Sequence, residues 1–285
     1  RDNGLFLNYV NEYQKFTKQN SEVNLEDSNG RAIWALGYAF NVMEEGIDLD
    51  VSLLQKITWS IKHFNEKIEH FKSPRALAFA IKGLYFFNLK WNDIKVNNII
   101  NNAANKLAEL YDFHSEKDWN WFEPYLTYAN SVLPESLLYA WRATGDNRFK
   151  LIAKESFDFL LTKIFKSNAI RIISNQNWLI KGFDEHTAYN GGEQPIDVAY
   201  TILALKQFNT AFPFEDYDEK MELAFSWFLG NNQLKQIVYN PCTSGCHDGL
   251  EEHNVNLNQG AESTVSYLIS RFAFENIPLN TELPY

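Results

Sequence analysis

The feature that most constrains the fold of this sequence is a repeated alternation between two kinds of helical pattern. Segments that are apolar along one face alternate with segments that are apolar almost all round. A helix of the first kind lies between core and solvent, whereas a helix of the second kind must be buried. The first kind covers residues 5–16, 51–71, 94–111, 149–164 and 217–229. The second kind covers residues 32–40, 76–87, 135–143 and 196–208, and a last helix is expected after an N-cap at Asn258.

The starts of the buried helices recur along the chain, each at a glycine or a proline. They are Gly30, Pro74, Pro134, Pro195 and Gly260. Successive starts are therefore 44, 60, 61 and 65 residues apart, which is typical of helical-hairpin repeats or somewhat longer. Proline suits the first helical position because its missing N–H would have no partner there. The likeness of QPID (194–197) to QGAE (259–262) supports the repeat.

This alternation predicts an all-α fold, an (α/α) toroid of five to six helical hairpins. The buried helices would form an inner ring and the amphipathic helices an outer ring. An open solenoid is the alternative, but the helix starts carry dissimilar functional residues, unlike a regular solenoid. We expect a single domain over residues 1–285, excised from or C-terminal in a longer chain, because the sequence begins at Arg1. Residues 170–180 alternate like a strand and predict a small hairpin.

Charge and composition exclude several classes of partner. The net charge of −10 argues against nucleic acid and against an anionic membrane surface. No run of about 18 apolar residues predicts a membrane-spanning helix, and we expect no signal peptide. Two cysteines in 285 residues do not make a disulfide framework, so we expect a reducing, cytoplasmic location.

In a closed toroid the inner helices run parallel, so their N-termini would meet at one mouth. Each N-terminus carries unpaired N–H groups and partial positive charge. The loops that enter these helices are rich in carboxylates, amides, arginines and aromatic rings, which suits a neutral polyhydroxylated ligand. The predicted substrate-binding residues are Asn29, Arg31, Arg75, Trp121, Tyr128, Asn130, His186, Glu193, Gln194, His247, Asn258 and Gln259.

Four carboxylates near the same helix starts are candidates for acid/base catalysis. Glycoside hydrolysis needs two carboxyl groups, roughly 5–5.5 Å apart for retention or about 6.5–9.5 Å apart for inversion. We expect Glu262 and Asp248 to be the first pair, with Asp197 and Glu123 as further candidates. The competing interpretation makes Glu262 a first-turn acid that offsets the helix dipole and Asp248 an Asp-Gly turn residue.

Cys242, Cys246 and His247 raise the question of a zinc site, because thiolates and imidazole are zinc ligands. Adjacent Cys246 and His247 are awkward for one ion, and no distant cysteine supplies a further ligand, so we expect no metal and no cofactor. A disulfide across the short loop is the alternative for an exported protein.

The tryptophans and arginines divide by position. Trp34, Trp141 and Trp227 lie inside helical patterns and are expected in the core, whereas loop residues Trp119, Trp121 and Trp178 are expected to stack on sugar rings. Arg31 and Arg75 could bind an acidic group or brace neighbouring helices. No glycine-rich loop follows a predicted strand, so a Rossmann-type nucleotide-sugar site is not expected.

Several segments resemble a known family. They are DSNGRAIWALG, SPRALAFAIKGL, WFEPYLTYANSVLPESLLYAWRATGD, GGEQPIDVAY and GCHDGL…NQGAES. Together they are similar to the helical domain appended to some bacterial glycosyltransferases, which belongs with the six-hairpin glycosidase-like toroids. The resemblance implies this fold, a carbohydrate context and a glycosyltransferase domain in the same chain. The chain departs from full six-hairpin enzymes because only five helix pairs are visible.

Together these patterns predict a carbohydrate-active domain that acts on an oligosaccharide or glycan. The sharper hypothesis is glycoside-hydrolase-type acid/base chemistry in a funnel at the inner-helix N-termini. One alternative is a non-catalytic glycan-binding or scaffolding domain of a larger glycosyltransferase, and another is a metal-dependent enzyme.

Overall fold

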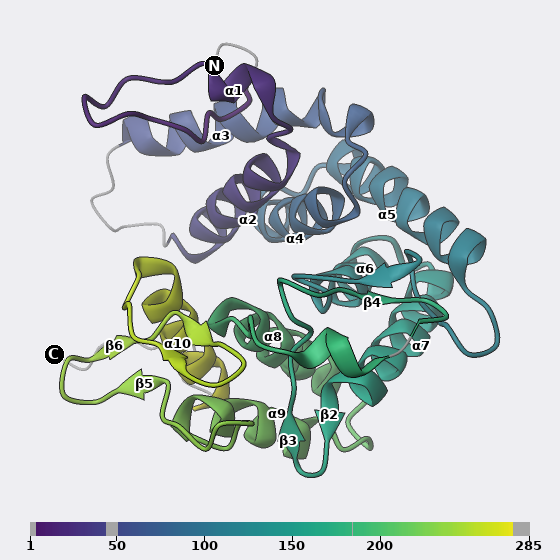
Figure 1. Ribbon diagram of the computed structural model, residues 1–285. Coiled ribbons are helices and arrows are strands. Elements are labelled where there is room, and N and C mark those ends of the chain that lie inside the picture. Colours follow the sequence, from purple (N-terminus) through teal and green to yellow (C-terminus); the bar gives the residue numbers. More distant parts are fainter. Residues whose placement is uncertain (1–3, 44–50, 184, 276–285) are drawn as a thin grey trace, which may run out of the picture. The chain divides into compact units, whose positions relative to one another are not determined.

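The computed structural model describes residues 4–43, 51–183 and 185–275, which group into two compact units (Figure 1). Unit 1 falls within residues 1–109 and 136–151, and unit 2 within residues 110–135 and 152–285. The α-helices are α1 (Gln19–Glu22), α2 (Glu26–Val42), α3 (Val51–Asn65), α4 (Pro74–Trp91), α5 (Ile94–His114), α6 (Val132–Thr144), α7 (Asn147–Ile164), α8 (Pro195–Ala211), α9 (Tyr217–Ser226) and α10 (Ala261–Phe274). Short 3₁₀ helices are η1 (Ile68–His70), η2 (Glu185–Tyr189) and η3 (Trp227–Leu229).

Most of the predicted helices are confirmed, and their burial follows the sequence pattern. Almost every residue in the first three turns of α4 is buried, as is most of α8. Two residues explain why α4 begins at this point in the chain. The Ser73 hydroxyl accepts a hydrogen bond from the Ala76 N–H at 3.2 Å, and Pro74 occupies the first helical position. At the other end, Asn92 closes the helix in a left-handed conformation, with φ 51°.

Helices α2 and α4 pack with their backbones almost in contact within unit 1. A Cβ atom built on Gly37 would lie 1.9 Å from the Gly83 carbonyl oxygen, so neither position has room for a side chain. Gly30 plays a related role, because its Cβ would lie 2.7 Å from the Ala76 oxygen. The structure therefore corrects the prediction that Gly30 starts a helix: it lies inside α2, which begins four residues earlier at Glu26. Burial along α2 is also only partial.

The predicted helix over residues 5–16 is wrong. This segment is a loop closed by an isolated bridge between Val10 and Phe16. The Asn11 side-chain oxygen accepts hydrogen bonds from the backbone N–H groups of Tyr13 and Lys15, both at 3.0 Å. Asparagine competes with helical hydrogen bonding in this way, which explains why an apolar stripe at helical spacing did not form a helix.

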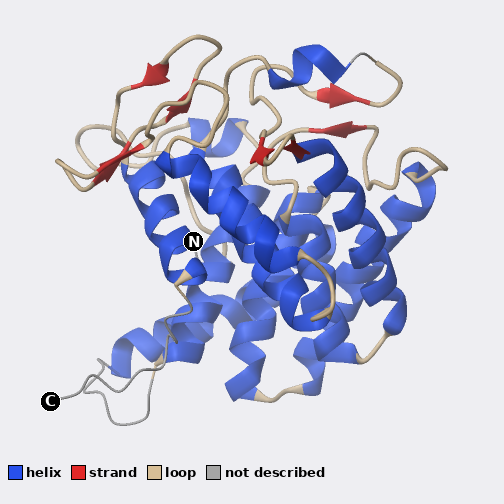
Figure 2. Cartoon of the chain, turned by 90° about the horizontal axis from the view of Figure 1, so that it is seen from below, coloured by secondary structure: helices blue, strands red, loops and turns tan. Residues whose placement is uncertain are grey.

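The short strands lie in unit 2, among loops at one end of its helices (Figure 2). They pair as β1 (Tyr125–Leu126) with β4 (Leu179–Ile180), β2 (Phe165–Lys166) with β3 (Ala169–Ile170), β5 (Tyr239–Asn240) with β6 (Gly245–Cys246), and β7 (Gly249–Leu250) with β8 (Val255–Asn256), all antiparallel. The predicted hairpin within residues 170–180 is therefore wrong. Its first residue, Ile170, pairs with Phe165, and its last two residues pair with residues 125–126.

Helix α10 forms where predicted, but its cap and its buried face differ from the prediction. Gly260, and not Asn258, is the N-cap residue. The buried face carries small and polar residues together with Tyr267, whereas four large apolar side chains are 36–51% exposed. These four are Val265, Leu268, Ile269 and Phe272. No helix in the described part of the chain combines the length and apolar character needed to cross a bilayer.

Candidate functional site

A cleft of about 360 Å³ lies within unit 2, where the loops preceding α8 and α10 meet. Its walls carry carboxylates and amides, and none of the residues that line it is Lys, Arg or His. The lining residues are Asn175, Gly192, Glu193, Gln194, Asp248, Gly249, Glu251, Asn256, Gly260, Ala261, Glu262 and Ser263. Four of the predicted site residues are thus brought together, namely Glu193, Gln194, Asp248 and Glu262.

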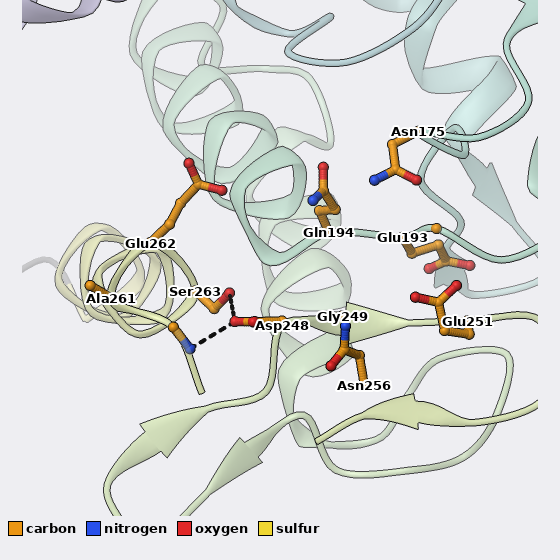
Figure 3. A pocket seen from close by; sticks show the side chains of 12 residues that line it. Asn175, Glu193, Gln194, Asp248, Gly249, Glu251, Asn256, Ala261, Glu262 and Ser263 are labelled. Atoms are coloured by element: carbon orange, nitrogen blue, oxygen red, sulfur yellow. Dashed lines mark hydrogen bonds between the residues drawn. The ribbon is translucent and has the colours of Figure 1, made fainter. Parts of the chain in front are cut away.

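Asp248 holds the start of α10 from a distance in sequence. Its Oδ1 accepts hydrogen bonds from the Gly260 N–H at 2.8 Å and from the Ser263 hydroxyl at 2.7 Å (Figure 3). A carboxylate at this position offsets the partial positive charge of the helix N-terminus. The Asp248 N–H in turn donates to the carbonyl oxygens of Asn256 and Asn258, at 3.2 and 2.9 Å. Asp248 is therefore a fixed carboxylate in the wall of the cleft.

Glu262 differs from Asp248 in being exposed. Its side chain makes no hydrogen bond or ion pair with any other residue that the structure describes. It projects from the first turn of α10 toward the side of the cleft where Gln194 and Asn175 lie (Figure 3). The carboxylate is therefore available to a ligand, with amide groups nearby that could hydrogen-bond hydroxyl groups.

Glu193 borders the cleft and has a strongly perturbed ionisation. It is fully buried, and burial raises the pKa of its carboxyl to about 7, opposed by Trp227 and Arg171. The Trp227 Nε1 donates a hydrogen bond to Oε2 at 2.8 Å, and the Arg171 Nε lies 3.4 Å from Oε1. This carboxyl points into protein, so it borders the cleft without being exposed in it.

Two of the predicted catalytic carboxylates lie elsewhere in unit 2. Asp197 accepts a hydrogen bond from the Ala129 N–H at 2.5 Å, and with Asn130 it borders a separate cavity of about 10 Å³. The Asn130 side chain closes its own loop through the N–H and C=O of Thr127, at 3.0 and 2.7 Å. Glu123 is also buried, and its carbonyl oxygen accepts a hydrogen bond from the Trp119 indole at 2.8 Å. None of these residues lines the cleft.

The loop tryptophans correct the prediction about sugar stacking. Trp121 is 0% exposed and Trp119 is 5% exposed, so neither has a free ring face for a sugar. Both rings contact Phe159, which explains their burial in a loop that is itself part of the core. Tyr128 is 37% exposed and Trp178 is 48% exposed, with Trp178 against Tyr125 at a ring-centroid distance of 5.0 Å.

The predicted site residues of unit 1 have contacts within that unit. The buried side chain of Asn29 accepts a hydrogen bond from the Phe6 N–H at 2.6 Å and donates to Leu25 at 2.8 Å. Arg31 lies over the Phe79 ring at 5.1 Å, and Arg75 is buried. Their participation in a shared mouth with unit 2 stays a prediction.

The remaining predicted site residues lie in two places, the loop that precedes α10 and the 3₁₀ helix η2. His247 bonds with the carbonyl oxygen of Leu257 at 3.1 Å, and exposed Gln259 accepts from the Thr243 hydroxyl at 2.8 Å. Asn258 is exposed and does not line the cleft. His186 lies in η2, but its side chain is outside the described part of the chain.

The two cysteines are free thiols, Cys242 exposed and Cys246 buried. Burial, with a smaller effect of Asp248, raises the pKa of Cys246 to about 12, so its thiol stays protonated at neutral pH. Among the residues that the structure describes, no group of three or more His, Cys, Asp or Glu side chains is arranged to hold a metal ion.

Four polar residues of the cleft are absent from the predicted site residues, namely Asn175, Glu251, Asn256 and Ser263. Asn175 reaches the cleft because its N–H donates to the Gly192 carbonyl at 3.1 Å. Glu251 is placed there because its neighbour Leu250 bridges to Glu193. These contacts are long-range, so no local pattern in the sequence signals them. Ser263 could have been found from its place one residue after Glu262.

Neither protein-family models nor curated protein sequences match this chain. Solved structures do resemble it. An unsaturated glucuronyl hydrolase from Streptococcus agalactiae has a TM-score of 0.64 at 14% identity, over 96% of this chain and 69% of that one. A sugar epimerase from a ruminal bacterium has a TM-score of 0.64 at 12% identity, over 97% and 80% of the two chains. Cellobiose 2-epimerase from Spirochaeta thermophila has a TM-score of 0.56 at 13% identity, over 89% and 70%.

These structures are six-hairpin glycosidase-like (α/α) toroids, so the chain has an all-α fold of the (α/α) toroid class. The fold predicted from the helical alternation is confirmed. At identities of 12–14% the likeness shows the fold and not the reaction.

Proposed function

We propose that this chain is a carbohydrate-active enzyme of the glycoside hydrolase type, and that the cleft at the starts of α8 and α10 is its active site. The observation that carries the proposal is the cleft itself. It places the exposed carboxylate of Glu262 and the fixed carboxylate of Asp248 in one polar hollow of about 360 Å³. Such a volume lies within the usual range for small-molecule sites.

The lining chemistry supports a sugar as the ligand. The amides of Asn175, Gln194 and Asn256 offer both donors and acceptors, which match the hydroxyl groups of a sugar. The similar fold of a glucuronyl hydrolase and of two sugar epimerases adds a carbohydrate context. We assign Glu262 as the general acid/base and Asp248 as the second carboxylate, because glycoside hydrolysis uses two such groups.

The test is Glu262→Gln, assayed for hydrolysis and binding on a panel of neutral and acidic oligosaccharides. We expect the rate of hydrolysis to fall by roughly 10²- to 10⁴-fold, the usual contribution of a general acid/base. Binding should change by only a few-fold, because the amide keeps the shape of the side chain. Glu252→Gln is the matched control, since Glu252 is exposed nearby and does not line the cleft. Unchanged turnover in Glu262→Gln would refute the assignment.

A second candidate function is supported by the structural role of Asp248 at the start of α10. Its Oδ1 is already engaged by Gly260 and Ser263, which is what a purely structural carboxylate would show. The chain would then be a non-catalytic glycan-binding domain of a larger glycosyltransferase. In that case the wild type would bind a sugar of the panel without cleaving any, and Gln194→Ala would weaken the binding.

A further inference from the structure

Glu193 joins several segments of the cleft wall through both its backbone and its side chain. Its N–H donates to the Leu250 carbonyl at 3.0 Å, and its own carbonyl accepts from the Leu250 N–H at 2.9 Å. This pair of bonds joins the loop before α8 to the segment that carries Gly249 and Glu251. The approach is close, because a Cβ on Gly249 would lie 2.2 Å from the Glu193 oxygen.

The side chain of Glu193 anchors the same wall to two further elements. Trp227, in η3, donates its indole N–H to Oε2 at 2.8 Å. Arg171 lies on the other side, with its Nε 3.4 Å from Oε1 and its Nη2 donating to the Tyr189 carbonyl at 2.6 Å. Among the described residues neither the Arg171 Nε nor the Glu193 Oε1 has a hydrogen-bond partner, so the two groups interact as an ion pair at 3.4 Å.

We propose that Glu193 is a positioning residue: it holds the wall of the cleft through Leu250, Trp227 and Arg171, and the charge on its carboxyl controls how firmly the cleft holds its sugar. The statement about the sugar rests on the function proposed above. Glu193 does not touch the ligand in this role, because its side chain is fully buried.

The chemistry of the buried pair gives this role a pH dependence. Burial raises the pKa of Glu193 to about 7, so the carboxyl changes charge near neutrality. The raised pKa means that the closed wall binds this proton more tightly than an opened wall, in which Glu193 would meet water. Above that pH the carboxylate is buried at a cost that Arg171 and Trp227 do not fully offset, so ionisation loosens the wall. The other charged or titratable groups nearby are Glu251, which accepts from Gln176 at 3.0 Å, and Tyr189, whose ring lies 5.6 Å from the guanidinium.

The first measurement needs no ligand. Amide hydrogen exchange of residues 192–194 and 248–251 is compared between pH 6 and pH 8, after correction for the intrinsic pH dependence of exchange. In the wild type we expect protection to be roughly tenfold higher at pH 6 than at pH 8, because the proton is bound more tightly in the closed wall than in the opened one. Glu193→Gln is neutral, as the protonated acid is, and keeps an acceptor for Trp227, so it should show protection that is equal at both pH values and close to that of the wild type at pH 6.

Further variants keep the proposal open to refutation if Glu193→Gln does not fold. Arg171→Gln should move the midpoint of the transition to higher pH, because it removes the positive charge that favours the carboxylate. Glu185→Gln is the control, since it removes a partly exposed ion pair with Lys163 at 2.5 Å and should leave the profile unchanged. Equal protection at both pH values in the wild type would overturn the proposal.

The second measurement separates this inference from the proposed function. The affinity for the best-bound oligosaccharide of the panel is measured by calorimetry from pH 5.5 to 8.5. Affinity that falls as the pH rises through 7 in the wild type and is flat in Glu193→Gln supports both proposals. Identical profiles in the two proteins would overturn the positioning role alone. Exchange that behaves as expected without binding of any sugar would refute the carbohydrate function alone.

Discussion

The starts of α8 and α10 share a sequence pattern and use it in opposite ways. Each has Gln, then a helix-starting Pro or Gly, then an acid two residues later, which is Asp197 in α8 and Glu262 in α10. Asp197 is 6% exposed and accepts a hydrogen bond from the Ala129 N–H, in a loop where Ala129 has a φ of 47°. Glu262 is exposed in the cleft. An acidic residue at the same place in the repeat therefore maintains the fold in α8 and is available to a ligand in α10.

The largest effect that would sharpen this comparison is expected for Asp197→Ala. The substitution leaves the Ala129 N–H buried without its acceptor, in a backbone conformation that alanine rarely adopts. We expect the free energy of unfolding to fall by roughly 3 kcal/mol in urea denaturation. Asp197→Asn, which keeps an oxygen acceptor, should lose only about 1 kcal/mol. If Asp197→Ala lowers the free energy of unfolding by less than about 1 kcal/mol, Asp197 does not maintain the fold and the contrast with Glu262 fails.

An intermediate effect is expected for Asp248→Ala, since Asp248 both lines the cleft and holds the residues at the start of α10. Removing it leaves the Gly260 N–H and the Ser263 hydroxyl without their shared acceptor. Loss of these two hydrogen bonds should lower the free energy of unfolding by about 1–2 kcal/mol, measured by urea denaturation. Hydrogen exchange should show the loss in the first turn of α10. If that turn keeps its full protection, Asp248 does not hold the start of the helix.

The smallest effect on stability is expected for Glu262→Gln. An exposed side chain without protein partners contributes little, so the free energy of unfolding should change by about 0.5 kcal/mol or less. The same urea denaturation series measures it beside the Asp197 variants. A large loss would mean that Glu262, like Asp197, serves the fold, and the two helix starts would no longer differ.

The helices were predictable because their signals are local. An apolar pattern, Ser73 as a cap and Pro74 at the first position determine α4 with little help from the rest of the chain. Residues 5–16 show the limit of this reasoning, since asparagine side chains, Asn11 and Asn20 among them, bind the backbone N–H groups of a segment whose apolar stripe predicted a helix. The exposed apolar face of α10 shows another limit, because the pattern indicates a face without saying what covers it.

The candidate site was less predictable because its contacts span the chain. Asp197 and Glu262 look alike in sequence, and only the position of the Ala129 N–H distinguishes them. Trp121 lies in a loop, but the ring of Phe159 draws that loop into the core. The bridge between Glu193 and Leu250, 57 residues apart, cannot be seen from either segment alone.

The glycine contact between α2 and α4 has a mechanical consequence. Helices usually slide past one another by rotating the side chains between them. Where Gly37 meets Gly83 there are no side chains to rotate, so we expect α2 and α4 to move as one rigid pair of helices. A rearrangement within unit 1 would then move this helix pair as a rigid body. The hinges of such a motion would lie in the loops at the ends of the two helices.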